Sequence, residues 1–235
     1  MDADQLDLKI TGHVVTPGRV LEDGWIGVRG EIVAGLGPAD SAAPAARQVI
    51  DARASGSCPG PTEAARGLWD QVASGVVDMI TSDHSPWDIA KKSRPDDIFA
   101  NASGIPGVQT MLPLAYAGVV AGHGLPVLRL AELVAASPAR VFGLAPRKGH
   151  LTAGADADLV VLDPAGTTRL HRGAMQSSAT WSPYHGMELP GRIGLTMVRG
   201  QVVYDGSSVT GPPGGGRLVR PQRAPRSSPA AAASR

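Results

Sequence analysis

The stretch VVDMITSDHSPW, residues 76–87, decides the fold of this chain. Residues 76–82 form a short apolar run, which is typical of a parallel strand buried on both faces. Pro86 has no backbone N–H to donate to a strand ladder, so pairing is expected to stop there. Asp83 would then lie at the C-terminal tip of a buried strand, where α/β barrels carry their catalytic groups. The alternative is that Ser82 and Asp83 only cap a turn, as these residue types often do.

A glycine-rich loop follows this segment and opens a helix-like stretch. The loop NASGIPG covers residues 101–107, and a helix is expected over about 107–121. Such a loop can bring backbone N–H groups close to a ligand. It can equally be a tight turn that uses glycine for positive φ, and both interpretations remain open.

Three motifs in order resemble the C-terminal half of the cyclic amidohydrolases. They are DMITSDHSPW at 78–87, GIPGVQTMLPL at 104–114 and ELVAASPARVFGL at 132–144. This family includes dihydroorotases, allantoinases and hydantoinases or dihydropyrimidinases. The SDHSP form of the first motif, with SPYHG at 182–186, is more similar to the allantoinase branch, whereas Asn101 and the GIPG sequence are more similar to the hydantoinases.

The two ends of the chain predict a small β-domain. Residues 6–10, 13–16, 25–28 and 32–36 read as the strands of a β-meander with turns at Pro17-Gly18 and Arg29-Gly30, and IDAR at 50–53 closes it. In the family this meander is one half of a β-sandwich. The resemblance implies that residues 149–163 and a last hairpin over 192–206, turned at Arg199-Gly200, supply the other half.

The barrel is predicted to be incomplete. Only residues 54–144 lie between the two sandwich halves, whereas a complete TIM barrel takes typically about 250 residues. The expected elements there are a helix over about 63–73, the strand over 76–82, the helix over about 107–121, an amphipathic helix over 127–136 and a final turn over 137–144. We interpret the junction near 54–58 as an internal deletion relative to the family.

The predicted fold is therefore α/β with a small composite β-sandwich built from both ends of the chain and a partial (β/α) fragment of a TIM barrel. The expected divisions are the first sandwich half at 1–53, the barrel fragment at 54–144, the second sandwich half at 145–206 and a disordered tail rich in Gly, Pro and Arg at 207–235.

The resemblance implies a metal-dependent chemistry. Opening a cyclic amide needs a strong nucleophile at neutral pH and a polarised carbonyl, and two bridged Zn2+ ions supply both in the family. The family holds the metals with a His-x-His pair, a carboxylated lysine, two further histidines and one aspartate that also carries the proton to the leaving nitrogen. Asp83 matches that aspartate. Asn101, Ser103, Gly104 and Gly107 match the loop that faces the substrate ring.

The other metal ligands have no counterpart in the sequence. No two of the histidines stand two or four positions apart, and no lysine occupies a barrel-strand position. One carboxylate cannot hold two metals, so Zn2+ binding is expected to be weak or absent. Tyr184 and His185 are expected in a surface loop, with a lid element as the alternative.

The composition also argues against nucleic-acid-binding, disulfide-stabilised and membrane-spanning proteins. The net charge of +1 includes five arginines beyond Asp205, so the rest of the chain is net acidic and offers no footprint for nucleic acid. Cys58 is the only cysteine, which excludes a disulfide framework. No leader pattern and no apolar run of membrane-spanning length is seen, so a cytoplasmic protein without membrane partners is expected.

Two functions follow from these observations. The first is a hydrolase of cyclic amide C–N bonds, acting on allantoin, hydantoin or dihydroorotate, whose missing strands another polypeptide would have to supply. The alternative is a catalytically inactive remnant or a binding and assembly module that lacks the metal site. Unpaired barrel edges predict a homo-oligomer or aggregation through residues 72–121.

Overall fold

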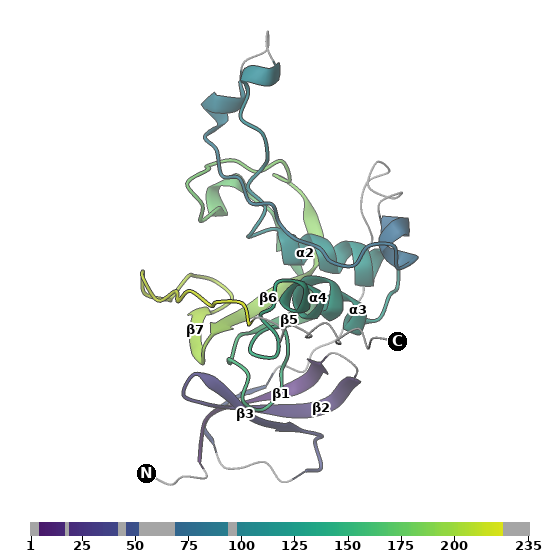
Figure 1. Ribbon diagram of the computed structural model, residues 1–235, viewed down its shortest axis with the longest axis vertical. Helices are drawn as coiled ribbons and strands as arrows, with labels where there is room; N and C mark the ends of the chain where they lie inside the picture. The colour runs from purple at the N-terminus through teal and green to yellow at the C-terminus, as the bar shows by residue number, and fades with distance from the viewer. Residues whose placement is uncertain (1–4, 17–18, 42–45, 52–68, 94–97, 223–235) are drawn as a thin grey trace, which may run out of the picture.

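The computed structural model describes residues 5–16, 19–41, 46–51, 69–93 and 98–222. Two small sheets lie at one end of the molecule, helices cover the second sheet, and long loops extend beyond the helices (Figure 1). The predicted turns of the meander at 17–18, the junction at 54–58 and Cys58 lie outside the described residues.

The first sheet has the strand order β3-β2-β1-β4. Its strands are β1 (Leu6–Thr16), β2 (Arg19–Arg29), β3 (Ile32–Gly37) and β4 (Ala46–Asp51). The strands expected over 6–10 and 13–16 are one strand, β1, whose register shifts between Gly12 and Val14. The meander prediction holds for β1 to β3, but β4 crosses over and pairs parallel with β1.

The second sheet has the order β5-β6-β7, with β5 (Leu159–Arg169), β6 (Glu188–Val198) and β7 (Gln201–Tyr204). The predicted hairpin at Arg199-Gly200 is confirmed. Both turn residues have positive φ, 46° and 77°, as a two-residue turn that matches the twist of its strands requires.

The two sheets share one hydrophobic core. It includes Ile26, Val28 and Val33 of the first sheet and Met197 of the second. Backbone hydrogen bonds also join the two parts of the chain: Val33 N–H donates to Ala155 O at 3.0 Å, and Gly154 N–H donates to Val33 O at 3.0 Å. Segments more than one hundred residues apart in the sequence therefore form one packed unit.

The hairpin turns of the two sheets press against each other. A Cβ at Gly200 would lie 1.9 Å from the carbonyl oxygen of Gly30, so no other residue fits at that position without a backbone shift. Close to this contact, Ala157 N–H donates to Glu31 O at 2.8 Å.

The helical layer lies between the sheets and the loops (Figure 1). Helix α2 (Met111–Tyr116) continues through a wider turn over Ala117–Gly122. Helix α3 (Val127–Ala131) continues through Glu132–Ala136 into α4 (Ser137–Val141). Both expected helices are confirmed. The final turn expected to begin at Ser137-Pro138 is helical as far as Val141, with Pro138 in the first turn of α4, where a missing N–H is tolerated.

The strand predicted over 76–82 is wrong: no strand is formed over the described residues 69–93. A parallel strand is stabilised by ladder bonds to its neighbours, and here residue 80 bonds only a helix, with Ile80 N–H donating to Leu133 O at 2.9 Å. Of the helix expected over 63–73, residues 69–73 are described and helical. The described residues between β4 and β5 thus form helices but no strand.

A second core holds the helices and this segment together. Val72, Tyr116 and Leu133 are buried in it, and Val77 and Ile80 pack against it. Tyr116 also contacts the second sheet, because a Cβ at Gly191 would lie 2.7 Å from its ring. The helices are therefore held from both sides.

Residues 207–222 return to the body of the protein, unlike the disordered tail expected over 207–235. Arg217 pairs with Glu31 at 2.9 Å, and Gln222 N–H donates to Gly143 O at 2.7 Å. Glycine-rich sequence can follow the protein surface closely because it has no side chains to clash. Residues 223–235 lie outside the described part.

Candidate functional site

Three loops meet at the end of the molecule remote from the first sheet (Figure 1). We call residues 82–92 the first loop, 101–110 the second loop and 171–187 the third loop, and together they form the loop cluster. The first loop carries a short 3-10 turn at Ile89–Lys92, the second follows one at Ile98–Ala100, and the third carries one at Arg172–Ala174. The loop cluster thus unites the first two family motifs with the SPYHG sequence at 182–186, whereas the third motif, 132–144, lies in the helices.

His84 connects the first loop to the second. Its Nδ1 accepts hydrogen bonds from the N–H of Gly107 at 3.1 Å and of Val108 at 3.2 Å. Beside it, Ser85 N–H donates to Ile105 O at 2.9 Å. Because Nδ1 accepts, the neutral ring carries its proton on Nε2. Sequence reasoning gave His84 no role.

The glycines of the second loop permit this close approach. Gly104 has φ of 83°, and a Cβ there would lie 2.5 Å from the Cβ of Ser85. A Cβ at Gly107 would lie 2.7 Å from Ser82 O. These contacts fit the tight-turn interpretation of the loop. A ligand-facing role for its backbone stays a prediction.

Asp83 lies at the start of this contact in an unusual conformation. Its φ is 41° and its side chain is exposed. Positive φ is uncommon for residues other than glycine and is often found at functional sites. The sequence placed Asp83 at a strand tip; the structure places it at the junction of two loops, with its carboxylate available to solvent.

The other predicted site residues lie close by. Asn101 is half-buried at the start of the second loop, and Ser103 is exposed two residues later. The sequence therefore located the loop correctly, while the part these side chains play in binding stays a prediction.

Gln109 attaches the third loop to the second. Its side-chain amide donates to Ala174 O at 2.9 Å and accepts from Gln176 N–H at 2.9 Å. Sequence reasoning missed this residue. Its only signal was a polar side chain directly before a helix, a position that commonly bonds neighbouring backbone.

Two tryptophans and two lysines tie the third loop to the first. Trp181 Nε1 donates to Trp87 O at 2.8 Å. Lys91 Nζ lies 4.7 Å from the centre of the Trp87 ring, and Lys92 Nζ lies 5.8 Å from that of Trp181, which are cation–π distances. Lys92 also donates to Ala102 O. These lysines therefore stabilise the loop cluster.

The histidines of the third loop also accept backbone hydrogen bonds. His171 and His185 stack edge to face with ring centres 4.8 Å apart. His171 Nδ1 accepts from Gly173 N–H at 3.1 Å, and His185 Nδ1 accepts from Arg172 N–H at 3.3 Å. Tyr184 packs against a small core around Leu170, which fits an anchored surface loop better than a lid.

The donor set does not fit a two-zinc centre. No group of three or more His, Cys, Asp or Glu side chains lies together within the described residues. In His84, His171 and His185 the Nδ1 atom accepts a hydrogen bond from a backbone N–H. A histidine that binds metal normally donates from one ring nitrogen and coordinates through the other. These three rings accept where a ligand histidine would donate or coordinate. Asp83 therefore has no partner ligand in the described part of the chain.

A charged network lies next to the sheets, away from the loop cluster. Asp156, 8% exposed, pairs with Lys148 at 2.8 Å and with Arg147 at 3.0 Å. Burial on its own raises the pKa of Asp156, but hydrogen bonds and attraction from Lys148 and Arg147 outweigh it and hold this pKa below its ordinary value. This network is structural, because it joins the end of the helices to the segment that pairs with β3.

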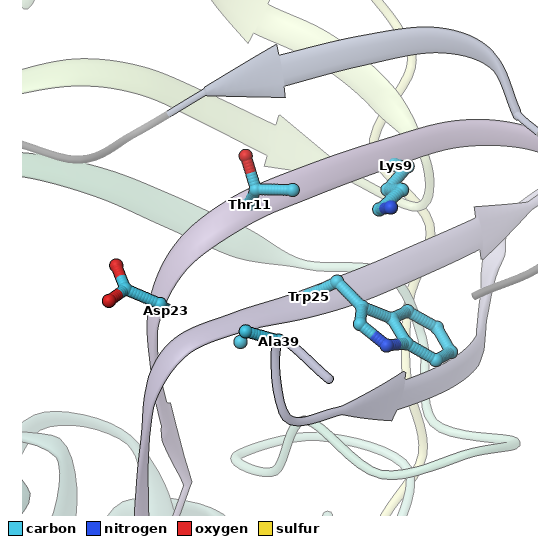
Figure 2. Close-up of a pocket in the computed structure, with 6 residues that line it drawn as sticks. Lys9, Thr11, Asp23, Trp25 and Ala39 are labelled. Atoms are coloured by element: carbon cyan, nitrogen blue, oxygen red, sulfur yellow. The ribbon is translucent and has the colours of Figure 1, made fainter. Parts of the chain in front are cut away.

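A shallow hollow of about 160 Å³ lies on the first sheet (Figure 2). Lys9, Thr11 and Trp25 line it, and the indole N–H of Trp25 already donates to Ser41 Oγ at 2.9 Å. Figure 1 places this sheet at the opposite end of the molecule from the loop cluster, so the hollow takes no part in the candidate site. Within the described residues, no helix is both long and apolar enough to cross a bilayer.

Comparison with known proteins agrees with the motifs. Residues 60–203 match the model of the amidohydrolase family. The chain is 42% identical over 163 residues to an allantoinase from Rubrobacter xylanophilus, covering 69% of this chain and 35% of that protein. It is 40% identical over 147 residues to a dihydroorotase from Halobacterium salinarum, covering 61% of this chain and 33% of that one.

The solved structures agree as well. A D-hydantoinase (dihydropyrimidinase) from Thermus sp. is 32% identical with a TM-score of 0.63, covering 66% of this chain and 34% of the other. An L-hydantoinase from Arthrobacter aurescens is 34% identical with a TM-score of 0.53, covering 60% and 32%. The chain thus spans about a third of the length of the relatives it matches. With the loop motifs, the family model and the solved folds in agreement, this chain belongs to the amidohydrolase family.

Proposed function

We propose that this chain supplies one wall of a site that hydrolyses the C–N bond of a cyclic amide. Asp83 carries the proton to the leaving nitrogen, and Asn101, Ser103, Gly104 and Gly107 face the substrate ring. The observation that supports this most is the exposed carboxylate of Asp83, held at φ of 41° where the first and second loops are joined.

The backbone of the second loop suits a planar ring with carbonyl groups. The N–H groups of Ser103 and Gly104 donate to no group in the described part of the chain, so they can bind a ring carbonyl. Relatives are named allantoinase, dihydroorotase and D-phenylhydantoinase. The SDHSP motif favours allantoin over hydantoin and dihydroorotate in this proposal.

The chain alone is not a complete hydrolase in this proposal. Two Zn2+ ions need several His and carboxylate ligands, and the described residues around Asp83 bring none. Turnover therefore requires further barrel elements. The second candidate, a binding or assembly module without chemistry, is favoured by this same absence of ligands among the described residues.

The finer architecture belongs to the same proposal. The two sheets form a composite β-sandwich from 1–53 and 145–206, and residues 54–144 are the last units of a TIM barrel. The shared core of the sheets and the matches to hydantoinase folds support this division. The chain works in the cytoplasm, and without its missing neighbours it self-associates through residues 72–121.

A chimera tests the function directly. The matched part of the Rubrobacter xylanophilus allantoinase is replaced by the corresponding residues of this chain, and allantoin turnover is measured. The chimera is expected to be active, and Asp83→Asn should lower kcat/KM by about 100-fold or more because a proton-transfer group is lost. Asp78→Asn, an exposed carboxylate on the same segment, should leave kcat/KM within about threefold.

The outcomes separate the two candidates. A folded, metal-loaded chimera without turnover would favour the module without chemistry. Equal activity of the Asp83→Asn and Asp78→Asn chimeras would show that Asp83 carries no proton.

A further inference from the structure

We propose that Gln109 is a positioning residue of the loop cluster and keeps Asp83 in place through the third loop. The proposal rests on the function proposed above, in which Asp83 carries the proton to the leaving nitrogen. Gln109 is assigned no contact with the substrate. It acts through contacts that run from the second loop to the third loop and from there to the first loop.

Gln109 stands on a rigid base at the start of α2. The next residue, Thr110, is 1% exposed, and its Oγ1 donates to Gly107 O at 3.2 Å. Met111 N–H donates to the same carbonyl oxygen at 2.9 Å. The helix then packs into the second core through Tyr116. The backbone of Gln109 is therefore fixed by a buried helix start.

The part of the third loop that Gln109 holds is exposed. The side-chain amide of Gln109 donates to Ala174 O at 2.9 Å and accepts from Gln176 N–H at 2.9 Å. The 3-10 turn over Arg172–Ala174 and Gln176 itself are exposed. Exposed segments with few buried contacts open more easily than a packed helix. Loss of the two hydrogen bonds would therefore release the third loop and leave the helix in place.

The third loop passes this support to the first loop. Trp181 Nε1 donates to Trp87 O at 2.8 Å, and Ser178 Oγ donates to Pro86 O at 3.3 Å. These two carbonyls belong to residues that follow closely after Asp83 in the sequence. A contiguous set of packed and hydrogen-bonded groups thus runs from Gln109 to the loop that carries Asp83.

Asp83 needs support from two sides because its backbone is strained. Its φ of 41° is uncommon for a residue with a side chain and persists only where the surroundings hold it. From the second loop, the N–H groups of Gly107 and Val108 hold His84. The third loop holds the other end of the same segment. Release of one side would let Asp83 shift, and a small displacement of a proton carrier lowers the rate strongly.

Variants of equal side-chain length test the role of Gln109. Gln109→Met removes both hydrogen bonds. Gln109→Glu can still accept from Gln176 N–H but cannot donate to Ala174 O. Gln71→Met is the matched control, because Gln71 is exposed on the helical residues 69–73 and outside the loop cluster.

Hydrogen exchange on the full chain follows the path of the contacts. In Gln109→Met, the Gln176 amide and the Trp181 indole N–H should exchange at least about fivefold faster than in the parent. The amides of Gly107 and Val108, which bond His84, should exchange about threefold faster because the first loop is less firmly held. The Gln71→Met control should leave all four rates unchanged.

Turnover separates positioning from binding. In the chimera with the Rubrobacter xylanophilus allantoinase, Gln109→Met should lower kcat by about tenfold and leave KM within about threefold, because the proton carrier shifts while the second loop stays on its helix. Gln109→Glu should have an intermediate kcat. Adding Gln109→Met to Trp181→Phe, which lacks the indole N–H, should lower kcat by less than about twofold further, since both changes cut one connection.

Three results would overturn the proposal. They are unchanged exchange of the Trp181 indole and of the Gly107 and Val108 amides in Gln109→Met, a raised KM with unchanged kcat, and full additivity of the Gln109 and Trp181 changes. Thermal unfolding checks that each variant folds, and Gln109→Glu is decisive if Gln109→Met does not. An inactive parent chimera would count against the proposed function, whereas exchange in the free chain still decides whether Gln109 holds the first loop.

Discussion

His84 holds the first and second loops together through one ring nitrogen. Replacing it by alanine leaves the N–H groups of Gly107 and Val108 without an acceptor. Because Gly107 is buried, we expect His84→Ala to cost about 1–3 kcal/mol locally. Hydrogen exchange should report this as faster exchange of these two amides.

His84→Asn is the matched variant, because its side-chain oxygen can accept in place of Nδ1. It should keep most of the protection. Equal exchange rates in both variants would mean that the two loops are held by the Ser85–Ile105 hydrogen bond instead.

The sequence identified Asp83 but not the contacts of His84, and the reason is the backbone angle φ of Asp83. Strand alternation predicts that His84 points away from Asp83, and the positive φ of Asp83 breaks that alternation. The loop around Gly104 could be located from the sequence because two segments that approach closely often need glycine at the contact. Gln109 makes contacts 65 residues away, which no local pattern encodes.

Among the elements, the segment that joins the helices to the sheets is held by charge. Asp156→Asn should lower the free energy of unfolding by about 2 kcal/mol near neutral pH, because Lys148 and Arg147 lose a buried partner. The folded pKa of Asp156 lies below the ordinary value of 3.8. Its contribution is therefore present above that value and is lost as the pH falls through the folded pKa.

Denaturant unfolding at neutral pH and near pH 3 measures this contribution. The difference between the parent and Asp156→Asn should narrow at the lower pH. Asp78→Asn, exposed and outside the network, should show no such difference. A gap of the same size at both pH values would contradict the charged network as its source.

Elements that are stabilised mainly by contacts within their own segment could be predicted from the sequence. The helices over 107–121 and 127–136 were expected from apolar spacing, and the Arg199-Gly200 turn from its glycine. The strand over 76–82 was not formed, because its apolar composition describes a strand only when neighbours complete the ladder. The parallel pairing of β4 with β1 was also missed, since composition does not specify which strand a crossover reaches.

At the scale of the molecule, exposed apolar side chains predict self-association. Phe99 is 95% exposed and lies within the segment 72–121. Phe99→Ser should raise the concentration at which the chain associates by about tenfold, because burial of that ring drives contact. Static light scattering over a concentration series measures the midpoint.

Leu218→Ser serves as the control, since Leu218 is 84% exposed but lies outside that segment. It should leave the association midpoint unchanged. An equal shift of the association midpoint in both variants would indicate nonspecific hydrophobic association and not association through residues 72–121.

The hydrogen bonds of Val33 to Gly154 and Ala155 have a consequence for how this protein tolerates rearrangement. The polypeptide leaves the first sheet after Asp51 and returns to the opposite edge of that sheet at these two bonds. The intervening segment therefore needs only to place Gly154 and Ala155 beside Val33. The entropic free-energy cost of closing this connecting segment rises slowly with its length, by about 0.6 kcal/mol for each doubling. We therefore expect the packing of the two sheets to tolerate changes in the length of the segment that connects them.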